Sequence, residues 1–201
     1  MADFEKAYAP LKSHEGGWIN NQADRGGETY AGISRKFFPS WEGWAIIDAE
    51  KVTSAYKKNA SAFSAHLSKI EPLNIMVRDW YRTNWWDPWG LGRFPQALAD
   101  EIFEQAVNLG KGGSGKYIQR VCNSFNLNKK TGKPLFVDLV EDGVVGPKTL
   151  SAMSTLLKDR TNDAALVHAL NCMQGAHYIG LAAKTPSQRT FVDGWMKRAQ
   201  L

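Results

Sequence analysis

Within residues 15 to 33, the carboxylates of Glu15 and Asp24 and the hydroxyl of Thr29 are spaced as a reaction would need them. Glu15 follows a predicted helix, and the partial negative charge at a helix C-terminus disfavours an ionised carboxylate. Trp18 offers an apolar wall nearby, which disfavours the charged form in the same way. A carboxyl group that keeps its proton near neutral pH can donate that proton to a leaving group. Glu15 is therefore the candidate general acid.

The other polar groups of this stretch suit supporting roles. Asp24 stands among glycines, in a polar setting where we expect it to stay ionised and to stabilise positive charge or help a water attack. Thr29 is expected to position that water, and the ring of Tyr30 to pack on a sugar. Two carboxylates in unlike environments are typical of glycoside hydrolysis. The Glu-Gly-Gly run alone has a plainer interpretation, a solvated helix end followed by ordinary turns.

The whole spaced set resembles the N-terminal motif of the glycoside hydrolase family 108 lysozymes, which occur as phage endolysins and as bacterial muramidase-like secretion activators. The residues that carry the resemblance are Glu15, Gly16, Gly17, Trp18, Asn20, Asp24, Gly26, Gly27, Thr29, Gly32 and Ile33. The resemblance implies that Glu15 is catalytic and that the enzyme is an N-acetylmuramidase. Asp24 and Thr29 also follow the Glu, Asp, Thr order of the phage-type lysozymes, with a shorter gap between them than in those enzymes.

The predicted elements are mostly helices. Apolar residues at helical spacing, capping residues and prolines predict helices over residues 3–14, 43–52, 58–70, 73–85 and 96–109. Gly16 and Gly17 are expected to end the first helix in the left-handed conformation. Residues 19 to 33 are expected to form a short irregular or hairpin-like turn that carries part of the site. We therefore predict a mainly α, lysozyme-like helical bundle.

Residues further along the chain could complete a substrate groove. In the aromatic stretch 80–90 we expect most rings to fill the core and Trp85 or Trp86 to line a groove; this stretch also resembles the equivalent part of family 108. Asn108 either hydrogen-bonds an acetamido group, positions Glu15 or closes its helix. The candidate substrate-binding residues are Trp18, Asn20, Tyr30, Trp85 and Asn108.

The helix expected at 96–109 has one apolar face and ends at Gly110, a natural C-cap. Its expected buried residues are Leu98, Ile102, Phe103, Ala106 and Leu109. Glu101 and Glu104 are spare carboxylates on this helix. We expect them to be solvated, with one of them as the second acid if Asp24 does not serve.

The remaining residues predict a second helical region. We expect a flexible joint at 111–115, a helix through Tyr117 and Phe125, and an exposed loop at 126–136. The run from Asp142 to Leu150 makes a tight turn that leads into a helix with proline at its first position. It resembles the signature of peptidoglycan-binding modules, although a structural role is an equal alternative. We expect a catalytic region at 1–110 and a peptidoglycan-binding-like region at 111–201, packed against it.

Charge and motif content narrow the partners. The formal net charge of +5 suits an anionic partner such as the cell wall. The basic residues are scattered and form no nucleic-acid motif, so we expect no nucleic-acid partner. Histidines do not stand at metal-ligand spacing from cysteines or acids, so we expect no metal and no cofactor. Cys122 and Cys172 are expected to be small buried residues, and their pairing stays open.

No apolar run approaches the ~20 residues that span a bilayer, and the N-terminus lacks the features of a signal peptide. We expect a monomer made in the cytoplasm that acts on peptidoglycan after release or export by another factor. The expected reaction is cleavage of the β-1,4 bond between N-acetylmuramic acid and N-acetylglucosamine. The alternative is a wall-binding or secretion-assisting protein with weak or no hydrolytic activity.

Overall fold

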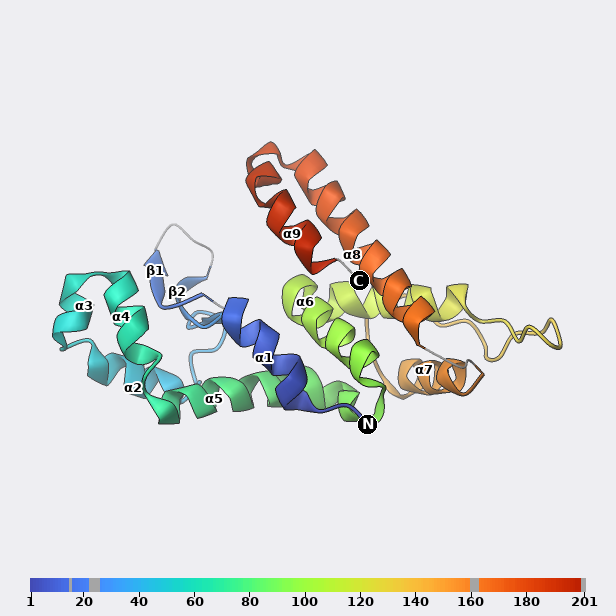
Figure 1. Cartoon of the computed structure of the whole chain (residues 1–201), viewed down its shortest axis with the longest axis horizontal. Helices are drawn as coiled ribbons and strands as arrows, with labels where there is room; N and C mark the ends of the chain where they lie inside the picture. Colours follow the sequence, from blue (N-terminus) through green and yellow to red (C-terminus); the bar gives the residue numbers. More distant parts are fainter. Residues whose placement is uncertain (15, 22–25, 160–162, 200–201) are drawn as a thin grey trace. The chain divides into compact units, whose positions relative to one another are not determined.

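The computed structural model describes residues 1–14, 16–21, 26–159 and 163–199 (Figure 1). The described chain is mainly helical with one small antiparallel sheet, which confirms the predicted fold class. Its internal contacts divide it into two compact units. We call residues Tyr8–Asn84 the hairpin unit, and Met1–Ala7 with Trp85–Leu201 the long-helix unit.

The hairpin unit holds three short strands and a set of mostly short helices. Its elements are α1 (Phe4–His14, whose first residues belong to the other unit), β1 (Ile19–Asn21), β2 (Gly27–Tyr30), β3 (Ile33–Ser34), α2 (Gly43–Glu50), α3 (Ser54–Lys58), α4 (Ala60–Leu67) and α5 (Glu71–Tyr81). The helix predicted over 58–70 is present as the shorter α4, whereas α3 before it was not predicted. Asn59 has an extended backbone between them, and its side chain caps α4 by accepting a hydrogen bond from the N–H of Ala62 (2.8 Å).

The sheet has the order β1-β2-β3, with antiparallel pairing throughout. This confirms the hairpin expected at 19–33. The two-residue turn after β2 has positive φ at both Ala31 (45°) and Gly32 (75°). Positive φ at both central residues gives a tight turn whose twist matches that of the strands. The hydroxyl of Tyr81 on α5 donates a hydrogen bond to the carbonyl of Ala31 (3.0 Å), which holds the turn against the helix.

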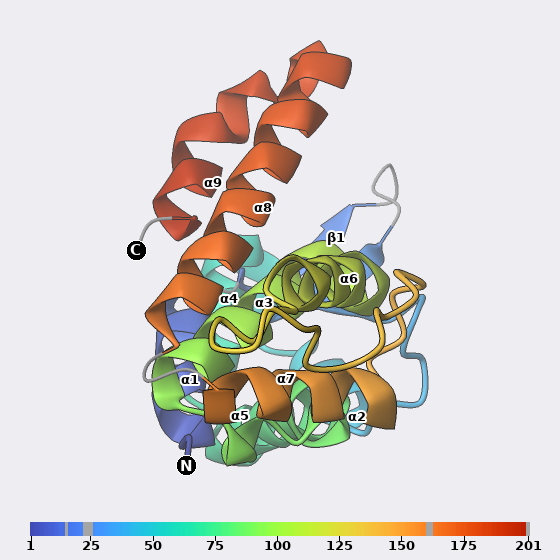
Figure 2. The same ribbon diagram turned by 90° about the vertical axis from the view of Figure 1, so that its right-hand side faces the viewer.

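The long-helix unit follows a π-helical turn (η1, Arg82–Trp86) at the end of α5. Its elements are η2 (Asp87–Trp89), η3 (Leu91–Arg93), α6 (Gln96–Ser124), α7 (Pro147–Asp159), α8 (Ala164–Lys184), η4 (Pro186–Phe191) and α9 (Val192–Arg198). Figures 1 and 2 show α9 lying alongside α8, and α8 contacts α6 extensively. Most rings of the aromatic stretch fill the core as predicted, with Tyr81, Trp86 and Trp89 buried.

Gly110 interrupts α6 with a non-helical backbone (φ 75°, ψ 158°), so the helix is broken at the predicted position but not by a left-handed cap. The flexible joint predicted at 111–115 is wrong, because α6 continues through these glycines. Gly115 lies directly against the backbone of Gly143, where a Cβ atom would overlap the Gly143 carbonyl. Close packing of a loop on the helix therefore outweighs the low helix propensity of glycine.

The apolar face predicted for 96–109 is buried at Leu98, Ile102, Phe103 and Ala106, and only partly buried at Leu109. The expected solvation of Glu101 and Glu104 is wrong. Both are partly buried, because polar side chains of α8 cover them. Asn171 donates to Glu101 Oε2 (2.8 Å) and Gln174 donates to Glu104 Oε2 (2.7 Å).

Both cysteines are free. Cys122 is buried, as expected, and burial raises the pKa of its thiol to about 12. The expectation of burial is wrong for Cys172, which is exposed on α8. None of the described helices is both long and apolar enough to span a membrane.

Candidate active site

Trp18 anchors the base of the hairpin. Its side chain is buried, and its indole N–H donates to Glu28 Oε1 on β2 (2.8 Å). The ring meets Tyr56 and Phe63 edge to face, with centroids 5.5 and 5.1 Å away. These contacts make Trp18 part of the core that supports the hairpin. Its expected contact with substrate stays a prediction.

Gly17 brings the chain against α4. A Cβ atom at this position would overlap Cβ and Oγ of Ser64, and that hydroxyl accepts a hydrogen bond from the N–H of Trp18 (2.8 Å). Gly17 does not have a positive φ. The predicted left-handed cap is therefore wrong for Gly17, and the glycine is needed for close approach to a neighbouring helix.

Four charged side chains tie β2 to α2, and we call them the hairpin ion cluster: Glu28, Arg35, Asp48 and Lys51. Glu28, whose side chain is 11% exposed, contacts Arg35 Nε and Lys51 Nζ, each at 2.9 Å. The same two cations contact Asp48 at 2.8 and 2.7 Å. The hydrogen bond from Arg35 is the main reason that the pKa of Asp48 falls to about 2. The cluster adds alternating charges to the apolar contacts that Trp18, Tyr30 and Ile33 bury at the hairpin.

A pocket of about 130 Å³ lies in the hairpin unit. It is lined by Tyr8, Gly16, Gly17, Tyr30, Ala31, Ser64, Ser68, Asn74 and Val77. Gly16 directly follows Glu15 in the sequence. Asn74 donates from Nδ2 to the carbonyl of Ser68 (2.9 Å), so polar groups from α4 and α5 meet beside the hairpin. Such a pocket can accept a small polar group of a ligand.

The predicted catalytic residues are only partly described. Glu15 and Asp24 lie outside the described residues. Thr29 is half-buried on β2, and its Oγ1 donates to the carbonyl of Gly27 (3.5 Å). Because side chains alternate along a strand, Thr29 faces away from Tyr30 and does not line the pocket. All three catalytic assignments stay predictions.

The predicted substrate-binding residues fall in both units. Tyr30 lines the pocket and is buried, and burial raises the pKa of its hydroxyl. Asn20 is exposed on β1 opposite Glu28. Trp85 belongs to the long-helix unit, where the ammonium of Lys111 lies 5.4 Å from its ring centroid.

Asn108 also belongs to the long-helix unit, where its amide makes contacts within its own helix and with α9. It donates to the carbonyl of Glu104 (2.9 Å) and to Glu104 Oε1 (2.6 Å), and it accepts from Arg198 Nη1 (2.7 Å). The hydrogen bond from Asn108 to the carbonyl of Glu104, four residues earlier in the same helix, is the kind of contact expected if Asn108 helps to close its helix. Contact with an acetamido group stays a prediction.

Sequence reasoning missed four polar residues. Glu28 stands in the variable place of the Gly-Gly-x-Thr motif, and its strand position beside Thr29 was the available signal. For Ser64 the available signal was Gly17, because a glycine at that position can indicate that another element packs closely against it. Asn74 borders the apolar stripe of α5, whereas the sequence gives no signal for Ser68, which meets the pocket only through the fold.

The model of the family described as Glycosyl hydrolase 108 matches residues 9–110. The chain belongs to glycosyl hydrolase family 108. A second model, described as Predicted Peptidoglycan domain, matches residues 116–200. The two matches support a protein that hydrolyses or binds peptidoglycan, and the first supports a glycoside hydrolase. The first matched segment ends and the second begins within α6. The compact units, in contrast, are divided between residues 84 and 85, so the expected domain boundary at 110 stays a prediction.

The solved structure of Brucella abortus SagA is similar to the structure of this chain, with a TM-score of 0.51. The match covers 98% of this chain and 88% of that chain, at 22% sequence identity, and it shows a shared fold. No curated protein matches the sequence.

Proposed function

We propose that this protein is an N-acetylmuramidase that cleaves the β-1,4 bond between N-acetylmuramic acid and N-acetylglucosamine in peptidoglycan. The observation that carries the proposal is the pocket beside Gly16 and Gly17, whose lining residues other than Tyr8 lie within the family 108 segment. Three of its lining residues, Ser64, Ser68 and Asn74, carry polar side chains. The chain therefore offers a site for a polar sugar substituent directly after the candidate acid, Glu15.

In the proposed reaction Glu15 protonates the glycosidic oxygen as the bond to the sugar carbon breaks. Asp24 stabilises the oxocarbenium-like state or helps a water attack, and Thr29 helps to place that water. Glu28 is a positioning residue, because its bonds to Trp18 and to the hairpin ion cluster fix the strand that carries Thr29. The reaction needs no group beyond these side chains and water.

The decisive variant is Glu15→Gln, assayed by reducing-sugar release from purified peptidoglycan. Because the amide cannot donate a proton to the leaving group, the rate should fall by about 10²–10⁴-fold. Glu42→Gln is the matched control, because Glu42 is an exposed carboxylate of the same unit without a capping hydrogen bond. Full activity in the Glu15 variant, with the fold verified by circular dichroism, would refute the assignment.

Asp24→Ala should lower the same rate less than Glu15→Gln does, because a nearby water can take over part of a stabilising role. Unchanged turnover would show that another residue assists Glu15.

The mass of the fragments released from peptidoglycan distinguishes a muramidase from an enzyme that cuts the peptide stem.

A second candidate function is supported by the match of residues 116–200 to a peptidoglycan domain. In that case the protein binds the wall and hydrolyses it weakly or not at all. Sedimentation with insoluble peptidoglycan, run beside the sugar-release assay, distinguishes the two, since binding without release favours the second.

A further inference from the structure

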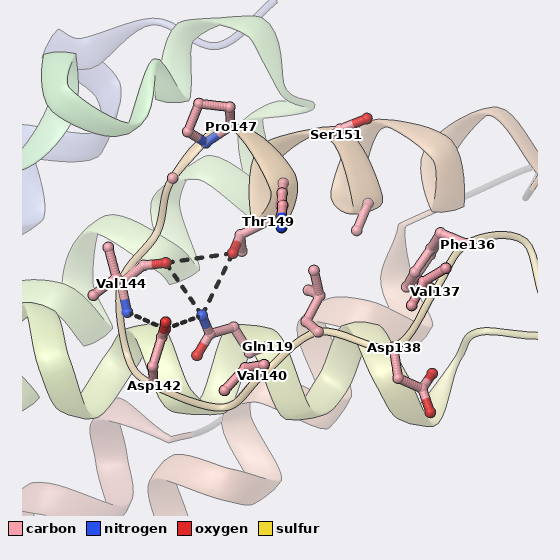
Figure 3. Close-up of a pocket in the computed structure, with 14 residues that line it drawn as sticks. Gln119, Phe136, Val137, Asp138, Val140, Asp142, Val144, Pro147, Thr149 and Ser151 are labelled. Carbon is pink, nitrogen blue, oxygen red and sulfur yellow. Dashed lines mark hydrogen bonds between the residues drawn. The ribbon is translucent and has the colours of Figure 1, made fainter.

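A groove of about 970 Å³ lies in the long-helix unit and shares no lining residue with the pocket described above (Figure 3). It is bounded by Gln119 of α6, by parts of the irregular segment 136–146 and by the first turns of α7. Its volume is at the upper end of the range for ligand-binding clefts. All of its lining residues fall within the segment matched by the peptidoglycan domain model.

Three amide side chains hold the irregular segment in place, and we call Gln119, Asn123 and Asn126 the amide ladder. Asn123 donates to the carbonyl of Leu139 (2.9 Å) and accepts from its N–H (2.8 Å). Asn126, just beyond α6, donates to the carbonyl of Phe136 (2.7 Å) and accepts from its N–H (3.0 Å). Each amide therefore pairs with the main chain as a neighbouring strand would.

Gln119 holds the far end of the segment, as Figure 3 shows. This nearly fully buried amide donates to Asp142 Oδ1 (2.7 Å) and to the carbonyl of Val144 (3.1 Å), and it accepts from the N–H of Gly143 (2.8 Å). The bond from Gln119 is the main cause that lowers the pKa of Asp142. Gly143 has a φ of 83°, which favours glycine, and it lies against the backbone of α6. The groove is thus formed before any ligand arrives.

The lining favours a peptide over a sugar. Val137, Val140 and Val144 are 90%, 77% and 68% exposed, although they line the groove. Among the described lining residues Phe136 is the only aromatic, so the groove offers little flat ring surface on which a sugar could stack. Because the ladder occupies the main chain of Phe136 and Leu139, the N–H and C=O groups of Val137 and Val140 have no hydrogen bond to any described residue. An extended peptide with small side chains can hydrogen-bond to such free main-chain groups, in the manner of an added strand.

Two opposite charges at the groove suit the same ligand. Asp138 and Lys148 both line it, and neither forms an ion pair with a described residue. Asp138 uses only Oδ1, which accepts from Asn126 (2.8 Å), within that part of the chain. The peptide stem of peptidoglycan is rich in alanine and carries free carboxylates, together with an amino group where it is not cross-linked. It therefore matches both the small apolar lining and the two charges.

We propose that this groove binds the peptide stem of peptidoglycan, so that the chain grips the stem in one unit and cuts the glycan with the other. The inference rests on the proposed function in that it takes peptidoglycan as the substrate. Main-chain pairing at Val137 and Val140 would give affinity, Lys148 would receive a stem carboxylate, and Asp138 would receive the free amino group.

The test uses the full chain carrying Glu15→Gln, so that the ligand is not degraded. Calorimetry measures binding of a synthetic tetrapeptide, L-Ala-D-Glu-meso-diaminopimelate-D-Ala, and sedimentation compares intact peptidoglycan with glycan strands whose stems have been removed. Val140→Glu in this background should weaken tetrapeptide binding at least about tenfold, because it places a charge among apolar contacts and near stem carboxylates. Val52→Glu in the hairpin unit is the matched control, since Val52 is 76% exposed and Val140 is 77% exposed.

Tetrapeptide binding that is lost in the Val140 variant and kept in the Val52 variant supports the inference. Equal binding of glycan strands with and without stems, or equal affinity in the two variants, overturns it. Reducing-sugar release by the unsubstituted chain is measured in parallel. Stem binding without sugar release would sink the muramidase proposal and support the groove, whereas sugar release without stem binding would do the reverse.

Discussion

Glu101 is a partly buried carboxylate in a polar network between α6 and α8. It accepts hydrogen bonds from Gln105 (3.2 Å) and Asn171 (2.8 Å). Burial, and then the charge of Glu104, raise its pKa to about 7. Asn171 Oδ1 is buried without a hydrogen-bond partner among the described residues. The network therefore accommodates the protonated form of Glu101 better than the ionised form.

The free energy of unfolding should consequently depend on pH. Glu101 is protonated in both states below its unfolded pKa of about 4.5, so its contribution is complete there. That contribution is lost as the pH rises through the folded value of about 7, and its size is at most about 3 kcal/mol. Urea unfolding from pH 5 to pH 8 should show the decline in the unsubstituted chain.

Glu101→Gln should flatten this decline, because the amide stays neutral and a rotated Asn171 amide can accept from it. Asp193→Asn is the control, since Asp193 is an exposed carboxylate of the same unit whose loss should leave the pH dependence intact. An unchanged slope in the Glu101 variant would show that other groups set the pH dependence.

For single residues, the sequence predicts the kind of role that a side chain can play. It predicts less well what surrounds that side chain in the fold. Cys122 and Cys172 carry the same side chain at helical positions, yet one is buried and the other exposed. Glu101 looks like an ordinary helix carboxylate until α8 covers it. Whether these side chains are buried depends on which helices pack together. The sequence of one helix does not show where its neighbouring helix lies.

The hairpin shows how an element of few residues can be held by charge. β2 has four residues, and Glu28 within it contacts both cations of the hairpin ion cluster. Asp48 contacts the same cations, but its side chain is 47% exposed against 11% for Glu28. Solvent screens the contacts of Asp48 even though its pKa falls to about 2, so Glu28 is the more important anion.

Glu28→Gln should lower the free energy of unfolding by about 1–3 kcal/mol, because it leaves two partly buried cations with one anion fewer. Gln can still accept from the Trp18 indole, so the core contact is kept. Asp48→Asn, the matched change on the exposed side of the cluster, should cost less than about 1 kcal/mol. Denaturant titration of both variants checks the order, and a larger loss in the Asp48 variant would contradict it.

Elements are predicted well where periodicity decides and poorly where contacts decide. Helices near 3–14, 43–52 and 96–109 follow from apolar spacing, and α1, α2 and α6 begin as expected. The split between α3 and α4 needs the extended backbone at Asn59, and the helix through 111–115 needs the loop that packs on it. The packing of that loop cannot be read from the local sequence, whereas the N-cap at Asn59 is local and its residue type favours it.

For the whole molecule, the net charge of +5 predicts how it associates with the wall. Peptidoglycan stems carry carboxylates, so attraction at long range should speed and strengthen binding. Raising NaCl from about 50 mM to about 500 mM should weaken sedimentation of the Glu15→Gln chain with peptidoglycan by about tenfold, because salt screens charges beyond a few ångströms. Affinity that stays constant or rises with salt would contradict this expectation and point to apolar contacts alone.

The family could be predicted from the N-terminal motif because its residues stand close together in sequence. The pocket of the hairpin unit could not, because Tyr8, Ser64 and Asn74 come from three separate helices. The groove of the long-helix unit lies at the Asp-Gly-x-x-Gly-Pro motif, yet the motif predicts only a turn and a helix. The cavity between them depends on amides of α6, far earlier in the chain.

The amide ladder has a consequence for how this protein could diversify. Asn123 binds Leu139 only through its N–H and C=O groups, and Asn126 binds Phe136 in the same way. Any residue other than proline supplies the same two groups. Apart from Asp138 and Asp142, whose carboxylates accept hydrogen bonds from the ladder, the side chains of segment 136–142 are thus free to change while the course of the wall stays fixed. A library that randomises Val137 and Val140 would explore new ligand preferences on an unaltered scaffold.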